Sequence, residues 1–264
     1  MMRALWTAST GMLAQQMNVD NISNNLANVN SVAYKKSRVE FKDLLYETME
    51  NGMVKDGQGK PVNLQVGHGV MTAATVKFFT TGNLEATENP YDLAINGSGF
   101  FKVLGDDGKE YYTKDGSFKI SPDGENFNLV TSDGYFVQGD NGNIELGTDV
   151  EDVSVNGVGL ISVKREDGTT EEIGNLSVST FVNPAGLESV GRNLYSPTSA
   201  SGEAFDTEND GTGGEILQGY LEYSNVQVVE EMVKLIQAQR AYEMNSKTIQ
   251  TADDMLSMAN NLRR

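Results

Sequence analysis

Both ends of this chain carry a seven-residue hydrophobic repeat, and this feature constrains the fold more than any other. Near the start, apolar side chains follow alternating three- and four-residue steps, interrupted once by Gln15. Near the end, apolar residues recur every seven positions, and alanines follow three of them. The repeated positions are Leu5, Met12, Val19, Ile22, Leu26 and Val29 at the start, and Val228, Leu235, Tyr242, Ile249 and Leu256 at the end. This spacing predicts two helices that pair with each other as a coiled coil, with these residues as the helix seam within one subunit.

The first of these helices contains asparagines where a helix usually carries stronger helix formers. An Asn costs several tenths of a kcal/mol relative to Ala at an interior helix position. On a helical wheel, Asn18, Asn21, Asn25 and Asn28 form one stripe beside the apolar seam. A neutral amide both donates and accepts hydrogen bonds, so it can pack against an identical helix without bringing a net charge. We therefore predict contacts between subunits at these residues and, on the second helix, at Gln239, Arg240 and Asn245.

The middle of the chain predicts antiparallel β-structure. Asp-Gly or Asn-Gly pairs recur at eight- to ten-residue intervals between residues 107 and 142, with short aromatic or β-branched runs between them. Such pairs favour tight hairpin turns. Residues 46–69 are rich in glycine and polar residues around the run VNLQV, which indicates an extended hairpin or linker. The expected fold class is α+β, with two terminal helices, an inserted antiparallel β-rich domain and an extended hairpin linker.

These patterns divide the chain into four predicted regions. They are a coiled-coil helix over residues 1–34, a linker with the extended hairpin over 35–72, a β-rich outer domain over 73–224, and a second coiled-coil helix over 225–264. Ser224 or Asn225 is the expected N-cap of the second helix. Glu230 and Glu231 follow in its early turns, where the helix dipole favours negative charge.

Charge separates the ends from the middle. The chain has 20 basic and 37 acidic residues and a net charge of −17. The N-terminal region carries only Arg3 and Asp20, and the C-terminal helix carries equal numbers of both signs, so the negative charge lies in the middle. This composition argues against nucleic-acid binding and against a polybasic membrane anchor. No apolar run is long enough to insert into a membrane, and the N-terminus lacks the apolar core of a cleaved secretory signal.

Residues that could carry chemistry are few. The absence of cysteine excludes disulfides, thiolate catalysis and cysteine-ligated zinc, and His68 is the single histidine, between two glycines. The turn at residues 140–143 comes nearest to a calcium loop but lacks the required order of ligands. We therefore predict no enzyme, no cofactor and no metal site. Two alternatives stay open: a carbohydrate- or calcium-binding β-domain protein with helical ends, since carboxylates can pair across a sheet unseen, and a soluble assembly factor or chaperone.

Four stretches carry a family signature. They are ALWTASTGMLAQQ (4–16), ISNNLANVNSVAYKKSRVEFKDLLYET (22–48), FFTTGNLEATENPYDLAINGSGFFKV (78–103) and EYSNVQVVEEMVKLIQAQRAYEMNSKTIQTADDML (222–256). In this order and position they resemble the flagellar axial proteins, the family of rod and hook subunits. The combination of NNLAN near the start with QRAYEMNSK near the end is the most specific part of the resemblance. Ala33 departs from the family pattern, which more often has glycine at this turn position.

The resemblance implies a structural subunit without catalytic residues. It implies export through the flagellar export apparatus without a cleaved signal peptide, followed by polymerisation in the periplasm into a rigid helical tube of the basal body. The tube would transmit motor torque to the hook, and its terminal helices would line the export channel. Chain length and the segment 46–69 favour a subunit of the distal rod over a hook or proximal rod subunit. The implied partners are copies of the chain itself, proximal rod subunits, hook subunits, the surrounding ring (bushing) proteins and the export apparatus.

Overall fold

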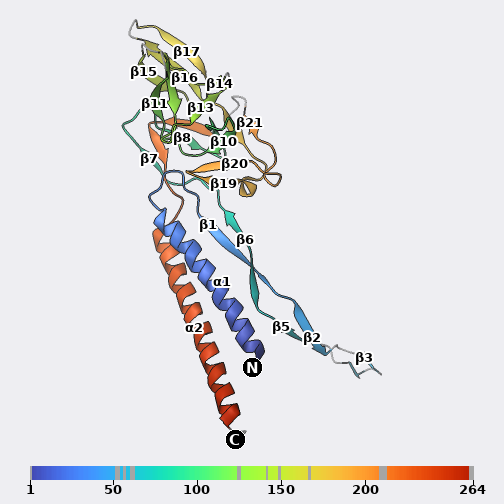
Figure 1. The fold of residues 1–264 in the computed structure, drawn as a ribbon. Coiled ribbons are helices and arrows are strands. Elements are labelled where there is room, and N and C mark those ends of the chain that lie inside the picture. The colour runs from blue at the N-terminus through green and yellow to red at the C-terminus, as the bar shows by residue number, and fades with distance from the viewer. Residues whose placement is uncertain are drawn as a thin grey trace. The chain divides into compact units, whose positions relative to one another are not determined.

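The computed structural model describes residues 2–50, 54–55, 58–59, 63–123, 126–140, 142–147, 150–165, 168–207 and 213–261 (Figure 1). The fold is α+β, as predicted, with an N-terminal helix, a β-rich body and a C-terminal helix. The chain divides into two compact units. Unit 1 comprises Met1–Ala27, Ser37–Val76 and Gln227–Arg264, and unit 2 comprises Asn28–Lys36 and Lys77–Val226.

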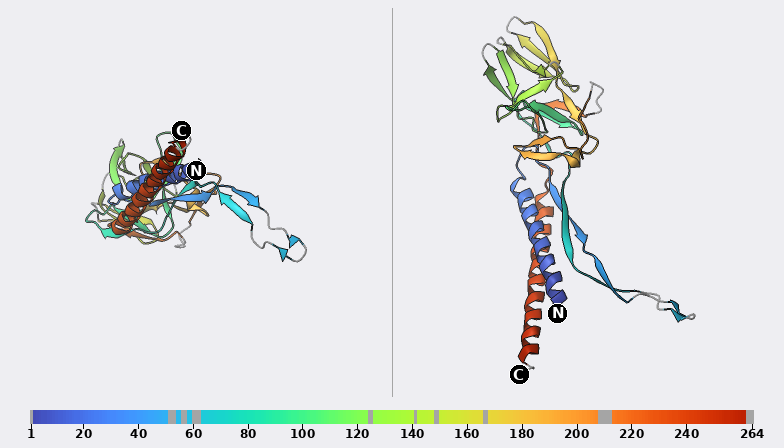
Figure 2. Two further views of the ribbon diagram at one scale, coloured as in Figure 1. Left: turned by 90° about the horizontal axis from the view of Figure 1, so that it is seen from below. Right: turned by 45° about the vertical axis from the view of Figure 1, so that its right-hand side comes forward.

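The helices α1 (Met2–Ala27) and α2 (Val228–Asn261) belong to unit 1. They lie side by side, and the N- and C-terminal ends of the chain lie at the same end of the pair, so the helices are antiparallel (Figures 1 and 2). α1 ends before residue 34, because Asn28 starts a turn in which its carbonyl accepts from the Ser31 N–H at 3.2 Å. Ala33 has a φ of +58°, in the left-handed region that favours glycine.

The segment before α2 differs from the prediction. Asn225 lies three residues before the helix, within unit 2. Its Oδ1 accepts from the Lys36 N–H at 2.8 Å, and its amide donates to the Phe78 carbonyl at 2.8 Å. Ser224 Oγ accepts from the Val226 N–H at 3.2 Å, so it bonds to a residue outside the helix. The prediction that either residue caps α2 is therefore wrong, because both side chains bond to backbone outside the helix.

A β-ribbon completes unit 1. Its strands are β1 (Ser37–Asp43) paired with β6 (Val70–Lys77), β2 (Tyr46–Glu50) paired with β5 (Leu64–Gly67), and β3 (Val54–Lys55) paired with β4 (Gln58–Gly59). The ribbon lies against α1: Glu47 pairs with Arg3 at 2.5 Å, and a Cβ added to Gly69 would lie 2.2 Å from Thr10 Oγ1. The predicted hairpin segment 46–69 falls here, and its residues 51–53, 56–57 and 60–62 lie outside the described residues.

Unit 2 consists of antiparallel strand pairs. The main sheet orders its strands β11–β12–β13–β9–β10–β20–β19, with β14, β18 and β21 paired off this path. Their bounds are β9 (Phe100–Leu104), β10 (Glu110–Thr113), β11 (Lys119–Asp123), β12 (Asn126–Val130), β13 (Phe136–Gly139), β14 (Gly142–Asn143), β18 (Val178–Thr180), β19 (Glu188–Gly191), β20 (Leu194–Ser196) and β21 (Phe205–Asp206). A second sheet is β15 (Val150–Val155), β16 (Leu160–Arg165) and β17 (Thr170–Asn175). The remaining pairs are β7 (Leu84–Ala86) with β23 (Tyr220–Glu222) and β8 (Leu93–Asn96) with β22 (Glu215–Gln218), and η1 (Pro184–Gly186) is a short 3-10 helix.

The Asp-Gly pairs have different roles in unit 2. Gly108, with a φ of +72°, lies in the turn between β9 and β10, and Gly134, with a φ of +91°, lies between β12 and β13. Gly116 instead allows close backbone approach, because a Cβ there would lie 1.6 Å from the Leu93 carbonyl oxygen. Gly124 and Asn141, which belong to two further predicted turns, lie outside the described residues.

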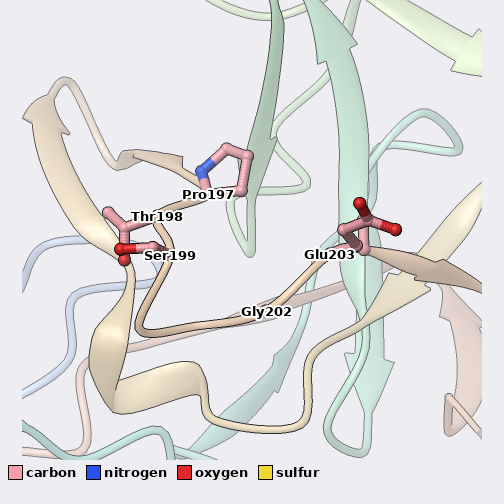
Figure 3. A pocket seen from close by; sticks show the side chains of 6 residues that line it. Pro197, Thr198, Ser199, Gly202 and Glu203 are labelled. Atoms are coloured by element: carbon pink, nitrogen blue, oxygen red, sulfur yellow. The ribbon is translucent and has the colours of Figure 1, made fainter.

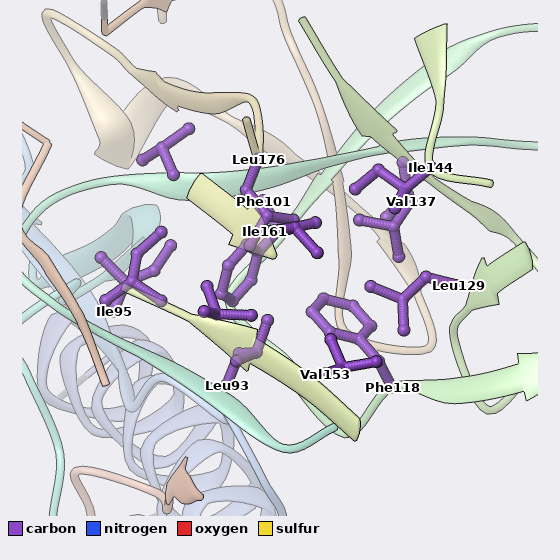
Figure 4. Close-up of a cluster of buried hydrophobic side chains, with 14 of the residues drawn as sticks. Leu93, Ile95, Phe101, Phe118, Leu129, Val137, Ile144, Val153, Ile161 and Leu176 are labelled. Atoms are coloured by element: carbon purple, nitrogen blue, oxygen red, sulfur yellow. The ribbon is translucent and has the colours of Figure 1, made fainter. Parts of the chain in front are cut away.

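The hydrophobic core of unit 2 joins its sheets (Figure 4). Phe101 of β9, Val137 of β13 and Ile161 of β16 are at most 1% exposed. Phe101 meets the Phe118 ring edge-on, with 5.1 Å between the centroids. Burial of such side chains contributes about 1.5–3 kcal/mol each. Unit 2 therefore has a core of its own.

Unit 2 also contains a buried cluster of charged groups. Glu222 Oε1 accepts from Lys35 Nζ at 2.5 Å and from the Gly82 N–H at 2.7 Å, and Lys114 Nζ lies 4.0 Å from Glu222 Oε2. These three charged residues are at most 1% exposed. Burial lowers the pKa of Lys35, and it lowers the pKa of Lys114 to about 8. The cluster ties residues 28–36, which follow α1 in the chain, to the end of β23, which precedes α2.

Candidate assembly surface

Small side chains dominate the buried faces of the helix pair in unit 1. The buried residues are Ala8, Ala14, Ile22 and Asn25 on α1, and Glu231, Ala238 and Ala252 on α2. Gly11 of α1 lies against Asn245 of α2, since a Cβ added to Gly11 would lie 2.9 Å from the amide nitrogen of Asn245. Glycine and alanine at a contact let two helix axes come close together.

The predicted seam residues lie at different depths. Ile22 is 3% exposed. The half-buried ones are Leu5, Met12, Val19, Leu26, Val29, Leu235, Ile249 and Leu256. Val228 and Tyr242 are 40% and 43% exposed, and Val29 lies beyond the end of α1. The assignment of these residues to a coiled-coil seam stays a prediction, and alanines occupy several of the most buried positions between them.

The asparagine stripe is used partly within the chain. Asn25 is buried and Asn21 is half-buried, and both bond to Ser37 of β1. Asn18 and Asn28 are half-buried, and Asn28 Oδ1 accepts from Ser31 Oγ at 3.2 Å. On α2, Gln239 and Arg240 are exposed and Asn245 is half-buried. The structure therefore gives Asn21 and Asn25 partners within unit 1, and the contacts between subunits predicted for the whole set stay a prediction.

Both helices carry an apolar stripe on the side opposite their buried faces, which the sequence analysis missed. This outer stripe consists of Met2, Trp6, Leu13 and Met17 on α1, and Val229, Met232, Val233, Ile236, Met244 and Met258 on α2. Trp6 is 70% exposed and Val229 is 76% exposed. Exposed apolar side chains gathered on one face mark an interaction site, although charged residues such as Arg240 and Lys247 share this face of α2. The available signal was the presence of apolar residues outside the heptad positions in segments with little net charge.

The described residues offer little for catalysis or ion binding. Among them, no group of three or more acidic or histidine side chains is placed to hold a metal ion. His68 is exposed, and Asn141 of the calcium-like turn lies outside the described part. An open hollow of about 480 Å³ in unit 2 is lined by Pro197, Thr198, Ser199, Gly202, Glu203 and Ala204, none of which is aromatic (Figure 3). Within the described part of the chain, no helix has the length and apolar character needed to cross a bilayer.

Family models match this chain at both ends and in the middle. Residues 5–35 match the flagella basal body rod protein family, and residues 94–163 match the D1 domain of the flagellar hook protein FlgE/F/G family. Residues 217–262 match the C-terminal family of the flagellar basal body rod FlgEFG proteins. The terminal matches include most of α1 and all of α2, the two helices that carry the outer stripe.

Full-length relatives agree with these matches. The flagellar basal-body rod protein FlgG of Borreliella burgdorferi is 46% identical, with 100% of both chains covered. The protein of the same name is 42% identical in Caulobacter vibrioides, covering 99% of this chain and 100% of the relative, and 37% identical in Bacillus subtilis, covering 100% of both. The resemblance to the flagellar axial proteins is thus confirmed. The chain belongs to the flagellar basal-body rod protein family, as a structural subunit of the flagellar rod.

Proposed function

We propose that this chain polymerises into the distal part of the flagellar rod, as a rigid helical tube that lines the export channel and transmits motor torque to the hook. The observation that carries the proposal is the outer stripe, which leaves Trp6 70% exposed on α1 and Val229 76% exposed on α2. Burial of apolar area by other copies stabilises a polymer by about 25 cal/mol per Å² before the costs of association. Full-length similarity to FlgG proteins supports the rod as the place of assembly.

The helix pair is the proposed inner layer of the tube. α1 and α2 pack as an antiparallel coiled coil within each subunit, with Ile22, Leu26 and Leu235 among the seam residues. Few net charges on these helices allow many copies to lie side by side without repulsion. Asn18, Asn28, Gln239 and Arg240 are the proposed polar contacts to neighbouring copies, and the acidic middle of the chain lies on the outside of the tube.

The cellular location and the partner proteins that we propose follow from membership of the flagellar rod protein family. The subunit is exported through the flagellar export apparatus without a cleaved signal peptide and assembles in the periplasm, as a structural protein without enzymatic activity. Its partners are proximal rod subunits on one side, hook subunits on the other, and the ring (bushing) proteins around the rod. Recognition by these partners takes place through protein surfaces and needs no cofactor.

We expect the terminal helices to be largely disordered in the free subunit and to become helical on assembly. Isolated helices with this much asparagine are marginal in water, and the outer stripe leaves large apolar side chains such as Trp6 and Val229 exposed in one copy. Far-ultraviolet circular dichroism of the dilute chain should therefore give less helix than α1 and α2 together contain. The sedimented polymer should give the full helical signal.

The free chain and the polymer come from one preparation, separated by sedimentation, so each serves as the control for the other. A fully helical, thermally stable monomer at low concentration would contradict the ordering on assembly. A chain that forms no sedimenting species and instead melts at a higher temperature when calcium is added would favour the calcium-binding alternative.

A further inference from the structure

The buried faces of the helix pair contain two polar side chains among alanines. Asn25 of α1 is 2% exposed and Glu231 of α2 is 3% exposed. The Asn25 amide donates to Glu231 Oε2 at 3.3 Å. Apolar residues at such positions commonly give a more stable pair, because burial of polar groups costs desolvation energy. Two buried polar residues that meet across the pair therefore point to a role other than stability.

Asn25 also holds the first residue of β1. Its Oδ1 accepts from the Ser37 N–H at 3.0 Å, and its amide donates to the Ser37 carbonyl at 2.8 Å. Asn21, one turn earlier on α1, donates to Ser37 Oγ at 2.8 Å. Only a side chain with both a donor and an acceptor can bond to the two backbone groups of Ser37 and to Glu231 together, so neither Asp nor Leu can replace Asn25.

Glu231 has a second partner on its own helix. Lys234 Nζ lies 2.6 Å from Glu231 Oε1, while Oε2 accepts from Asn25. Glu231 also lies in the first turn of α2, where the helix dipole favours a carboxylate. Both carboxylate oxygens are thus bonded in the observed arrangement of α1 and α2.

The contacts of Asn25 and Gly11 define one antiparallel register. Asn25 meets Glu231, and Gly11 meets Asn245. Gly11 to Asn25 is fourteen positions along α1, and Glu231 to Asn245 is fourteen positions along α2. The other buried residues nearby, such as Ala14 and Ala238, have single-methyl side chains, which make no directional contact. Packing of small residues alone therefore discriminates poorly between registers.

We propose that Asn25, Glu231 and Ser37 form a polar latch that sets the register of α1 against α2 and fixes β1 to the pair. A buried polar residue in a helix seam specifies register at some cost in stability. After a one-heptad slide in one direction, Asn25 faces Ala238 and Glu231 passes beyond the end of α1. After a slide in the other direction, Asn25 faces Ser224, which precedes α2. The same slide brings Glu231 opposite Asn18. Either slide separates Glu231 from Asn25, so only the observed register keeps these two groups bonded to each other.

Disulfide cross-linking can test the latch directly, because the chain contains no cysteine. The pair Gly11→Cys with Asn245→Cys reports the observed register. Gly11→Cys with Ala252→Cys, and Gly11→Cys with Ala238→Cys, report slides of one heptad in the two directions. Each full-length reporter is mixed as a small fraction into polymer of the unmodified chain, so that a reporter unable to polymerise alone is still measured. Disulfides within a chain are quantified by mass spectrometry after mild oxidation.

When Asn25 and Glu231 are unchanged, the disulfide between positions 11 and 245 should form in larger amount than the 11–238 and 11–252 disulfides. In the Asn25→Leu/Glu231→Leu background, the 11–238 or 11–252 disulfide should rise about tenfold, as expected when a coupling of about 1.4 kcal/mol is lost. Asn25→Asp alone should give a similar rise, because two carboxylates then face each other, and Asn25→Asp/Glu231→Gln should reverse most of it. Ser23→Asp, which introduces a carboxylate at an exposed position of the same helix, is the control and should change nothing.

The inference rests on the proposed pairing of α1 with α2, and the experiment separates the two. If the 11–245 disulfide does not form even without latch substitutions, the pairing itself is wrong. If it forms and stays the dominant product in both the double Leu variant and Asn25→Asp, the pairing stands and the latch is refuted.

Discussion

Leu235→Glu is expected to abolish polymerisation while unit 2 stays folded. Leu235 is half-buried on α2, one turn after the buried Glu231 and three residues before the buried Ala238. A carboxylate there loses apolar contact, is partly desolvated, and faces the charge of Glu231 at a spacing of four residues, where like charges repel. A loss of about 2 kcal/mol per subunit raises the critical concentration for assembly about thirtyfold. Leu26→Glu on α1 should act in the same way.

Sedimentation and electron microscopy measure the polymer, and near-ultraviolet circular dichroism of the tyrosines of unit 2 measures its fold. Leu235→Met keeps the volume and the apolar character, so it is the matched control and should polymerise. Intact filaments from Leu235→Glu or Leu26→Glu would refute the seam assignment. Loss of the unit 2 signal would mean that these residues act on monomer stability instead.

Glu222→Ala is expected to destabilise unit 2 by about 3–5 kcal/mol, the usual cost of removing one partner from a buried ion pair. Glu222 Oε1 bonds to Lys35 Nζ and to the Gly82 N–H, and Lys114 lies 4.0 Å from the other oxygen. Without the carboxylate, two buried lysines must either keep a charge with no counterion beside it or lose a proton. Urea unfolding of the full-length chain, followed in the near ultraviolet, gives the difference in free energy.

Glu171→Ala provides the matched control for this change. Glu171 pairs with Arg165, but the two side chains are 56% and 33% exposed. A partly exposed pair contributes at most about 1 kcal/mol, so the control should unfold close to the unmodified chain. Equal effects of Glu171→Ala and Glu222→Ala would mean that the cluster around Glu222 does not hold unit 2 together.

Heptad spacing was enough to predict α1 and α2, but it did not identify their buried faces in full. The prediction placed large residues such as Val228 and Tyr242 in the seam, yet both are more than a third exposed, whereas Ala238 and Ala252 are buried. Two helices that lie close together need small residues at their contact. A prediction that looks for large apolar side chains every seven positions gives little weight to such small residues. Because apolar residues also lie on the outer face, the sequence does not say which apolar stripe faces inward.

The roles of Asn25 and Glu222 depend on contacts that sequence spacing cannot reveal. Glu231 is 206 positions from Asn25, and Lys35 is 187 positions from Glu222. A hairpin turn is specified by neighbouring residues, so the turns at Gly108 and Gly134 could be predicted from the sequence. The need for glycine at position 116 comes from its close contact with the Leu93 backbone, which the sequence does not reveal. Local signals thus predicted the elements and their order, and the long-range polar contacts required the structure.

Neighbouring copies should cover the outer stripe on assembly, and the fluorescence of Trp6 measures this. Trp6 is the single tryptophan of the chain and is 70% exposed in one copy, so its fluorescence reports the outer stripe of α1 without labelling. The measurement is the emission spectrum of Trp6, and its quenching by iodide, in the dilute chain and in sedimented polymer. Burial of Trp6 by neighbouring copies should shift its emission to shorter wavelength and prevent its quenching in the polymer. A polymer in which Trp6 emits and is quenched as in the free chain would contradict it.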